Sequence, residues 1–159
     1  MGHMEPVSPA EEHLRRLGIP YRLFRHDHPV RSLEQAASER GMDADQIVRS
    51  LVFRLQDNSF ILVLMPGAGQ VAWGKLRHYL GVSRITTARS DEVFQVTGYR
   101  PGTVSPFGLA TSLRLLADER LRLQNEISLG AGIRDAGLIM DSHDLLEALS
   151  PELGDFSGD

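Results

Sequence analysis

Residues 97–108 have the sequence Thr-Gly-Tyr-Arg-Pro-Gly-Thr-Val-Ser-Pro-Phe-Gly, the most distinctive stretch of the chain. Its glycines and prolines predict an irregular loop, because glycine admits backbone conformations closed to other residues and proline has no amide donor. Gly102 allows close approach of the backbone to another group, and Pro106 stiffens the exit of the loop. Such a segment is either a binding loop or a surface turn.

Outward from this loop, the chain predicts short helices and strands. A capping-box pattern beginning at Ser8 predicts a helix that ends at Gly18, and a second helix is expected from Ser32 to Gly41. The further expected elements before the loop are strands at 21–26, 47–56 and 59–65, a helix at 73–80, a strand at 84–88 and a helical turn at 90–95. Those after it are strands at 113–117, 126–129 and 136–140 and a helix at 142–149.

Length and composition bound the class of protein. The chain has 159 residues, of which 42% are hydrophobic and 24% charged, as in an ordinary globular domain. We expect a cloning remnant at 1–4, a single domain at 5–150 and an acidic, flexible tail at 151–159. Without cysteine, the chain has no disulfide, cysteine-ligated metal or cysteine nucleophile, which favours the cytoplasm. The longest apolar run, 60–65, is too short to cross a membrane.

The charge is unevenly distributed. The formal net charge is −4, but residues 11–140 carry all 17 basic residues and 14 of the 21 acids, a formal charge of +3. Sixteen of the basic residues are arginines. A phosphate-containing partner is therefore compatible with the body of the chain.

Three familiar site patterns fail on spacing or context. The segment 67–72 matches a dinucleotide fingerprint, but it follows a hairpin rather than a βαβ unit, so a turn into a helix is the simpler interpretation. The glycines nearest Ser105 are three residues away, not two, which excludes a nucleophile elbow. His26 and His28 supply only two of the ligands that a metal needs. We predict no cofactor and no metal.

The order of several segments carries a resemblance. They are His28-Pro29-Val30, residues 32–37 (Ser-Leu-Glu-Gln-Ala-Ala), residues 46–53 (Gln-Ile-Val-Arg-Ser-Leu-Val-Phe), the loop 97–108 and Gly130-Ala131-Gly132. From about residue 10 to residue 149, the chain resembles the YbaK-like aminoacyl-tRNA deacylase family, which is related to the editing insertion domain of bacterial prolyl-tRNA synthetase.

The resemblance implies a mixed α/β (α+β) fold with a curved, mostly antiparallel sheet flanked by short helices. It implies a hydrolase that cleaves the ester between a wrong amino acid and the 3′ acceptor end of tRNA, for example alanine or cysteine on the tRNA for proline. The implied partners are aminoacyl-tRNA and an aminoacyl-tRNA synthetase, with no DNA and no membrane. Without a covalent nucleophile, attack by water assisted by the ribose hydroxyl of the substrate is the implied mechanism.

Independently of the family, the chemistry of the loop at 102–106 fits the reaction, because its backbone N–H groups can donate the hydrogen bonds that ester hydrolysis requires. Arg49 stands where relatives usually have a lysine that binds the tRNA end. Arginine can grip a phosphate with two N–H groups, but it cannot act as a neutral base. The predicted catalytic residues are Arg49, Gly102, Thr103, Val104, Ser105 and Pro106.

A second set of residues is expected to bind substrate. Ser50 follows Arg49 and should face the other side of the sheet, while His28 and Ser32 flank a helix N-terminus that could receive an anion. The full set is His28, Ser32, Ser50, Gly130, Gly132, Arg134 and Asp135.

Two other functions fit the same residues. One is a catalytically weak module that binds an aminoacyl end or an amino-acid-like ligand without turnover, which the arginine at position 49 allows. The other is a hydrolase for a small acylated metabolite that does not use tRNA.

Overall fold

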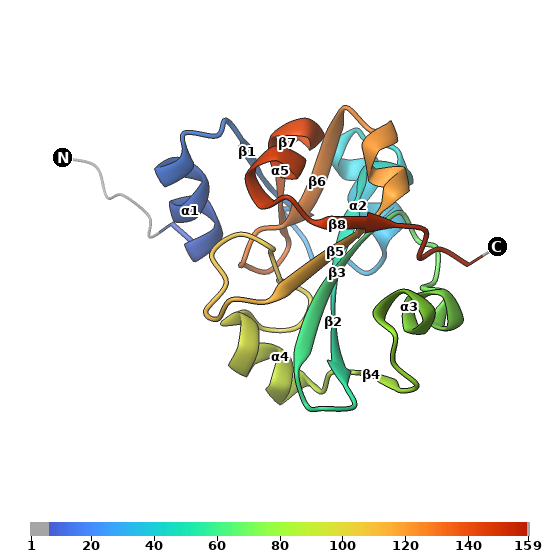
Figure 1. The fold of residues 1–159 in the computed structure, drawn as a ribbon. Coiled ribbons are helices and arrows are strands. Elements are labelled where there is room, and N and C mark those ends of the chain that lie inside the picture. Colours follow the sequence, from blue (N-terminus) through green and yellow to red (C-terminus); the bar gives the residue numbers. More distant parts are fainter. Residues whose placement is uncertain (1–6, 159) are drawn as a thin grey trace.

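The computed structural model describes residues 7–158, so the expected cloning remnant lies outside the described residues. The helices are α1 (Pro9–Leu17), α2 (Leu33–Arg40), α3 (Trp73–Leu80), α4 (Ser90–Thr97) and α5 (Ser142–Leu149), with 3₁₀ turns η1 (Ala44–Gln46) and η2 (Glu119–Leu123). The strands are β1 (Arg22–Arg25), β2 (Val48–Leu55), β3 (Phe60–Pro66), β4 (Ile85–Thr87), β5 (Arg114–Asp118), β6 (Glu126–Gly130), β7 (Ala136–Asp141) and β8 (Glu152–Gly154). Figure 1 shows their arrangement.

The helix boundaries follow the capping residues in the sequence. The Ser8 hydroxyl accepts a hydrogen bond from the N–H of Glu11, whose side chain bonds back to Ser8. Ser32 caps α2 through the N–H of Gln35. Each helix has eight or nine residues, and within residues 7–158 none is long and apolar enough to cross a membrane.

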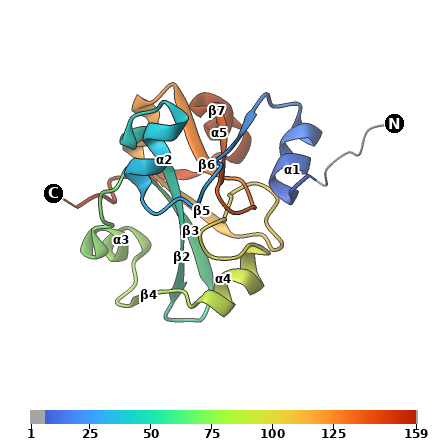
Figure 2. The ribbon, with the colours of Figure 1, turned by 180° about the vertical axis from the view of Figure 1, so that it is seen from behind.

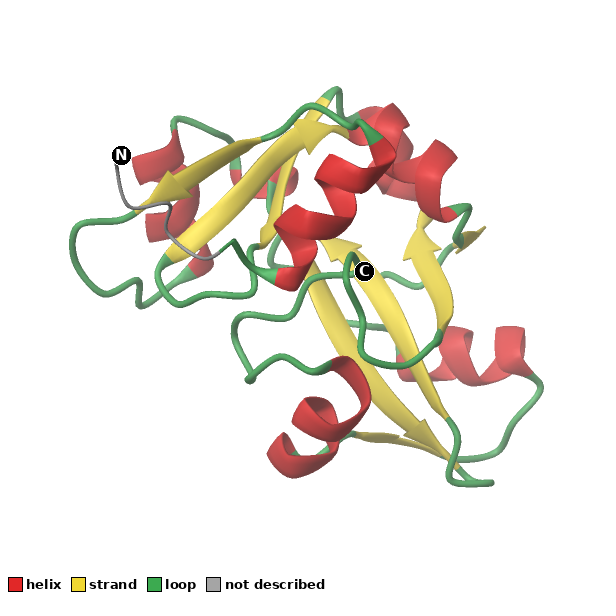
Figure 3. Ribbon diagram, turned by 90° about the vertical axis from the view of Figure 1, so that its left-hand side faces the viewer, coloured by secondary structure: helices red, strands yellow, loops and turns green. Residues whose placement is uncertain are grey.

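The strands form a three-stranded sheet, β1-β7-β6, and a five-stranded sheet, β4-β2-β3-β5-β8. Figure 3 shows them as two groups of strands, with the β2–β3 hairpin extending away from the smaller sheet. A parallel bridge between Ile47 and Ser128 links them. Of the six pairings between described strands, four are antiparallel. The mixed α+β class is confirmed, and its curved sheet is divided in two.

Strand β3 lies at the centre of the larger sheet and is buried on both faces. Leu62 and Leu64 belong to the cluster between the two sheets, whereas Ile61, Val63 and Met65 belong to a second cluster on the opposite face. Side chains alternate across a strand, so a strand covered on both sides needs a continuous apolar run. This explains the sequence of residues 60–65.

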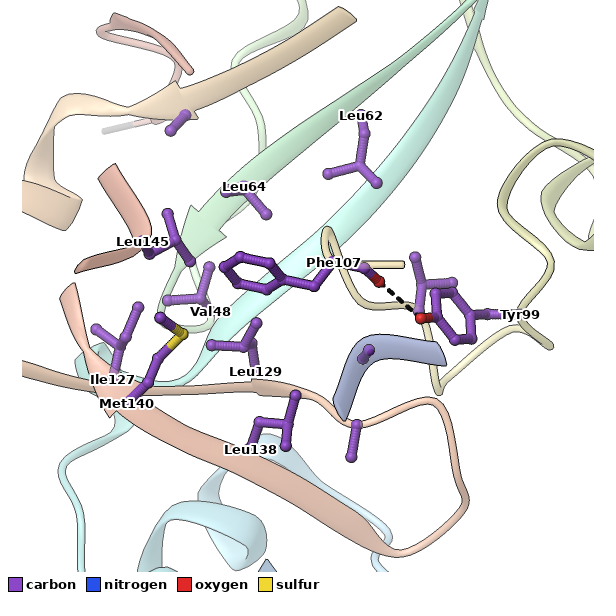
Figure 4. Packing of buried hydrophobic residues seen from close by; sticks show 14 of the residues in the cluster. Val48, Leu62, Leu64, Tyr99, Phe107, Ile127, Leu129, Leu138, Met140 and Leu145 are labelled. Carbon is purple, nitrogen blue, oxygen red and sulfur yellow. Dashed lines mark hydrogen bonds between the residues drawn. The ribbon is translucent and has the colours of Figure 1, made fainter. Parts of the chain in front are cut away.

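The loop 97–108 packs into the core and is no surface turn. Residues 103–107 are buried, and the Phe107 ring points among Val48, Leu64 and Leu145 (Figure 4). The Tyr99 hydroxyl donates to the carbonyl of Phe107 at 2.6 Å. Where the loop ends next to α1 (Figures 1 and 2), the N–H of Gly108 donates to His13 Nδ1 at 2.9 Å.

The C-terminal segment corrects one prediction. Residues 151–158 were expected to be a flexible tail, yet β8 extends the larger sheet beside β5 and the Phe156 side chain is fully buried in the second cluster. The carboxylate of Asp118 accepts bonds from the N–H of Phe156 (2.9 Å) and the hydroxyl of Ser157 (2.6 Å). The acidic composition of this segment concealed an apolar anchor, Phe156, and two groups that donate hydrogen bonds to the buried Asp118.

Candidate active site

A cleft follows the part of β2 that has no neighbouring strand on one side. Strand β4 pairs only with Phe53–Leu55, and the bridge to Ser128 involves Ile47, so the edge over residues 48–52 is left between them. The main cleft has a volume of about 490 Å³. Its lining includes β2 residues 49–53, Trp73 of α3, Val93 of α4, and Pro101, Gly102 and Val104 of the loop.

A smaller cavity of about 270 Å³, here called the side chamber, lies next to the main cleft. The two cavities share Arg49, Ser50, Leu51, Gly102 and Val104. The side chamber extends further, to Arg40, Val48, Leu129, Gly130 and Ala136. The loop and β2 therefore form the boundary that the two cavities share, here called the rim.

The loop 97–108, here called the donor loop, lines this rim with Gly102 and Val104. Within residues 7–158, the backbone N–H groups of these two residues have no bonded acceptor. Thr103 is engaged, since its N–H and hydroxyl both donate to the carbonyl of Arg100 at 3.0 and 2.8 Å. Gly102 has a φ of +86°, and a Cβ there would meet no atom within 4 Å. The glycine serves the backbone conformation and leaves open space beside it.

Two glycines of the last loop hold the donor loop in place. A Cβ at Gly130 would lie 1.9 Å from the carbonyl oxygen of Val104, so only glycine permits this contact. The N–H of Gly132 donates to the carbonyl of Thr103 at 2.9 Å. Gly132 lines a separate cavity together with Arg134. The predicted binding role of Gly130 and Gly132 becomes one of support, with Gly130 also lining the side chamber.

Arg49 lies across the cleft and holds the turn at residues 66–72, here called the glycine turn. Its Nε donates to the carbonyl of Gly67 at 2.7 Å, and its Nη2 donates to the carbonyl of Gly69. Burial of the guanidinium, with a further contribution from the charge of Arg120, lowers the pKa of Arg49 below its usual value. The remaining N–H groups of this half-buried cation are available to a ligand.

Ser50 gains importance from the structure. Its Oγ is buried, and it is the one buried side-chain polar atom in residues 7–158 that has no hydrogen-bond partner. Buried polar groups are normally paired, so an unpaired one that lines both cavities marks a place where a bound molecule can complete the bond.

Other predicted residues have structural roles instead. His28 bonds to Glu39 at 2.8 Å, Ser32 caps α2, and Asp135 accepts from the N–H of Val30 at 3.0 Å. None of these three residues lines the main cleft or the side chamber. Ser105 is fully buried and accepts from the N–H of Phe107 at 3.2 Å, and Pro106 is buried beside it. The structure does not bring these side chains to the site.

Two cleft residues were absent from the sequence prediction. Trp73, the single tryptophan of the chain, is 39% exposed and packs edge-to-face on Phe53 with 5.3 Å between ring centroids. Arg40, the last residue of α2, lines the side chamber. Neither stands in a motif, and only the packing of α2 and α3 brings them there. Among residues 7–158, no group of three or more metal-ligating side chains is placed to hold a metal ion.

The sequence profile of the aminoacyl-tRNA editing domain matches residues 27–148, which is more than half of the chain. The chain belongs to this family. The chain is 29% identical over 147 residues to the multifunctional Ser/Thr-tRNA deacylase ProXp-y of Escherichia coli (strain K12). The match covers 90% of this chain and 87% of that protein. The chain is 30% identical over 110 residues to a proline–tRNA ligase of Limosilactobacillus fermentum, covering 67% of this chain. This chain spans only about a fifth of that ligase's length.

A solved structure also matches the fold of this chain. A crystal structure described as a candidate trans-editing enzyme for prolyl-tRNA synthetase superposes with a TM-score of 0.85 and 25% identity, over 95% of this chain and 96% of the other. The family resemblance expected from the sequence is confirmed.

Proposed function

We propose that the editing domain acts in trans, in the cytoplasm, to hydrolyse the ester that joins a wrong amino acid to the 3′ end of tRNA. The observation that carries this proposal is the rim shared by the two cavities. Unpaired N–H groups of the donor loop, the unpaired hydroxyl of Ser50 and the guanidinium of Arg49 meet there.

These groups match the needs of the reaction. Water attacks the ester carbonyl, the bond to the ribose oxygen breaks, and that oxygen takes a proton as the free amino acid leaves. N–H groups of Gly102 and Val104 that bond the carbonyl oxygen stabilise its negative charge in the transition state. Ser50 Oγ can hydrogen-bond the ester or the attacking water. Arg49 remains charged and serves as an anchor, so the proton transfer falls to the water and the substrate's own ribose hydroxyl.

The substrate is proposed from the relatives. The similarity to prolyl-tRNA ligases points to the tRNA for proline, and the family resemblance implies alanine or cysteine as the wrong amino acid. The name of the E. coli relative adds serine and threonine as amino acids to test. A synthetase is a further candidate partner. The cleft volume of about 490 Å³ leaves room for more than a small amino-acid side chain, so part of the terminal nucleotide can share it.

A second candidate function follows from Arg49. Because two of its N–H groups already hold the glycine turn, the editing domain could bind an aminoacyl end without rapid turnover. In that case the cleft would be a binding module.

The deciding experiment measures hydrolysis of tRNAs charged with alanine, cysteine, serine, threonine and proline, with the free amino-acid esters in parallel. Turnover of a mischarged tRNA, with little on the free esters, supports trans-editing. Tight binding without turnover supports the binding module, and turnover of the esters alone supports a hydrolase for small acylated molecules. Affinity for tRNA should fall steeply with added salt if arginines bind phosphates; a flat dependence would contradict tRNA as the ligand.

A further inference from the structure

The side chamber is lined by two arginines and by no aspartate or glutamate. Arg40 donates from Nε to His26 Nε2 at 3.0 Å, from Nη1 to the hydroxyl of Ser128 at 2.8 Å and from Nη2 to the carbonyl of Ala136 at 3.3 Å. All three acceptors are uncharged groups. Arg49 likewise bonds only to carbonyls, those of the glycine turn.

Two half-buried cations without a directly bonded carboxylate are costly to keep in one cavity. Burial disfavours the charged form of each guanidinium and lowers the pKa of both Arg40 and Arg49. The nearest carboxylate in the Arg40 network is that of Glu39, which bonds to the other ring nitrogen of His26 at 2.6 Å rather than to the guanidinium. An anion that enters the chamber would offset this cost for both arginines.

Arg40 is also held in a fixed position. A Cβ at position 137 would lie 2.4 Å from Arg40 Cζ, so the guanidinium lies against the β7 backbone and requires Gly137. Its three bonds use one hydrogen from each nitrogen, which leaves one hydrogen on each terminal nitrogen for a ligand. This planar pair of donors matches two oxygens of a phosphate group.

We propose that the side chamber is a phosphate-binding subsite in which Arg40 and Arg49 together hold one phosphodiester group of the RNA 3′ end. This inference rests on the proposed function and assigns a positioning residue, Arg40, to it. A phosphate in the side chamber places the adjoining ribose ester at the shared rim, beside the donor loop. The terminal base or the amino acid then occupies the main cleft, next to Trp73.

The test uses Trp73 as a built-in probe, because it is the only tryptophan and it lines the main cleft. Adenosine and adenosine 5′-monophosphate are titrated against the parent chain and Arg40→Gln, following tryptophan emission. Inorganic phosphate is titrated in parallel by calorimetry to detect binding of the anion alone. Arg122→Gln, which removes the same charge from an exposed position outside the cavities, is the matched control.

We expect the parent and Arg122→Gln to bind the monophosphate about tenfold more tightly than adenosine, as one charged hydrogen-bonded contact provides. Arg40→Gln should lose most of this preference. Equal affinity for the two ligands in the parent, or an unchanged preference in Arg40→Gln, would overturn the proposal. Phosphate binding that survives in Arg40→Gln would also place the anion elsewhere.

Two further variants separate positioning from folding. Ser128→Ala removes one bond to Arg40 without changing charge, and Arg40→Lys keeps the charge without the planar fork; each should retain part of the preference. With a mischarged tRNA as substrate, Arg40→Gln should raise KM more than it lowers kcat. If the parent hydrolyses tRNA and Arg40→Gln keeps the parent KM, the inference alone fails. If no tRNA is hydrolysed but the monophosphate preference still depends on Arg40, the proposed function fails and the anion subsite stands.

Discussion

The two loops that border the main cleft are held in opposite ways. The donor loop is fixed through the Tyr99 hydroxyl, the Phe107 ring and the glycines at 130 and 132, and these contacts leave N–H groups at its rim unpaired. In the glycine turn, the carbonyls of Gly67 and Gly69 are occupied by Arg49. One wall therefore offers backbone donors, while the other fixes a side-chain cation.

The supports of the two loops also differ in their distance along the sequence. The donor loop is held partly by its own residues, whereas the glycine turn depends on the far C-terminus. The N–H of Ala72 donates to the carbonyl of Phe156 at 2.8 Å, and the N–H of Gly158 donates to the carbonyl of Gln70 at 3.0 Å. A change at the end of the chain should therefore affect one wall of the cleft and spare the other.

The largest effect is expected from removing this C-terminal support. Phe156→Ala, or a chain that ends at Ser150, loses a fully buried ring, which typically costs about 3 to 5 kcal/mol of the free energy of unfolding. Urea denaturation measures the loss. Leu153→Ala, at a side chain that is 36% exposed in the same segment, is the control and should cost much less. An unchanged denaturation midpoint in the truncated chain would contradict the role of this segment.

Gly102→Val should damage the donor loop with a smaller loss of stability. The β-branched side chain restricts a backbone that requires a φ of +86° and intrudes on the space beside the rim. Loss of one oxyanion donor costs about 3 kcal/mol of barrier, or roughly a hundredfold in rate. Gly81→Val is the control, because Gly81 has a φ of +68° and open space but lies outside the cleft. A full deacylation rate in Gly102→Val would place the carbonyl elsewhere.

Arg49→Ala should weaken tRNA binding by about tenfold or more, since a charged hydrogen bond to phosphate is worth about 1.5 to 3 kcal/mol. The same variant should loosen the glycine turn. Arg49→Lys separates the two roles, because a lysine restores the charge but not the paired bonds to the turn. Filter binding at low salt measures the affinity, with the exposed Arg16→Ala as control. Parent-like binding and hydrolysis in Arg49→Ala would remove Arg49 from the site.

Tyr99→Phe tests the internal support of the donor loop. It removes the bond to the carbonyl of Phe107 and should cost about 1 kcal/mol of the free energy of unfolding, with a modest fall in rate. The comparison is Tyr79→Phe, which removes a hydroxyl bonded to Glu152 on a side chain that is 41% exposed. If both variants unfold at the same urea concentration as the parent, the hydroxyl of Tyr99 does not stabilise the loop.

The smallest effect is expected from lowering the pH, and it concerns Asp118, which holds the C-terminal segment. Burial alone would raise its pKa, but bonds from the Ser157 hydroxyl and from the N–H groups of Arg120 and Phe156 lower the pKa below its ordinary value of 3.8. A lowered pKa means that this stabilisation is present above the ordinary value and is lost as pH falls through the folded-state value. Urea midpoints measured from pH 5 to pH 3 should fall more steeply in the parent than in Asp118→Asn. Parallel curves would contradict this account.

Local sequence signals predicted most of the regular elements. Capping residues at Ser8 and Ser32 and glycines such as Gly81 act through neighbouring residues, so they can be recognised in the sequence alone. The hairpin was also predicted, but with a two-residue turn at 57–58; Leu55 bonds to Ser59, so its loop has three residues, 56–58. The helices at 73–80 and 142–149 have the predicted bounds. β8 was not predicted, because three residues of an acidic segment carry no strand pattern of their own and pair only with β5.

The site divides in the same way. The sequence by itself singled out the donor loop, because its glycines and prolines are visible in a linear chain, whereas Arg49 and the neighbouring Ser50 were named from the family resemblance. Tertiary structure alone decided that His28, Ser32 and Asp135 hold elements together. It likewise decided that Trp73 lines the main cleft and that Arg40 lines the side chamber. It also decided that Ser50 is unpaired. The physical reason is that a ligand site depends on which donors and charges remain unpaired after folding, and that is a property of contacts between segments far apart in the chain.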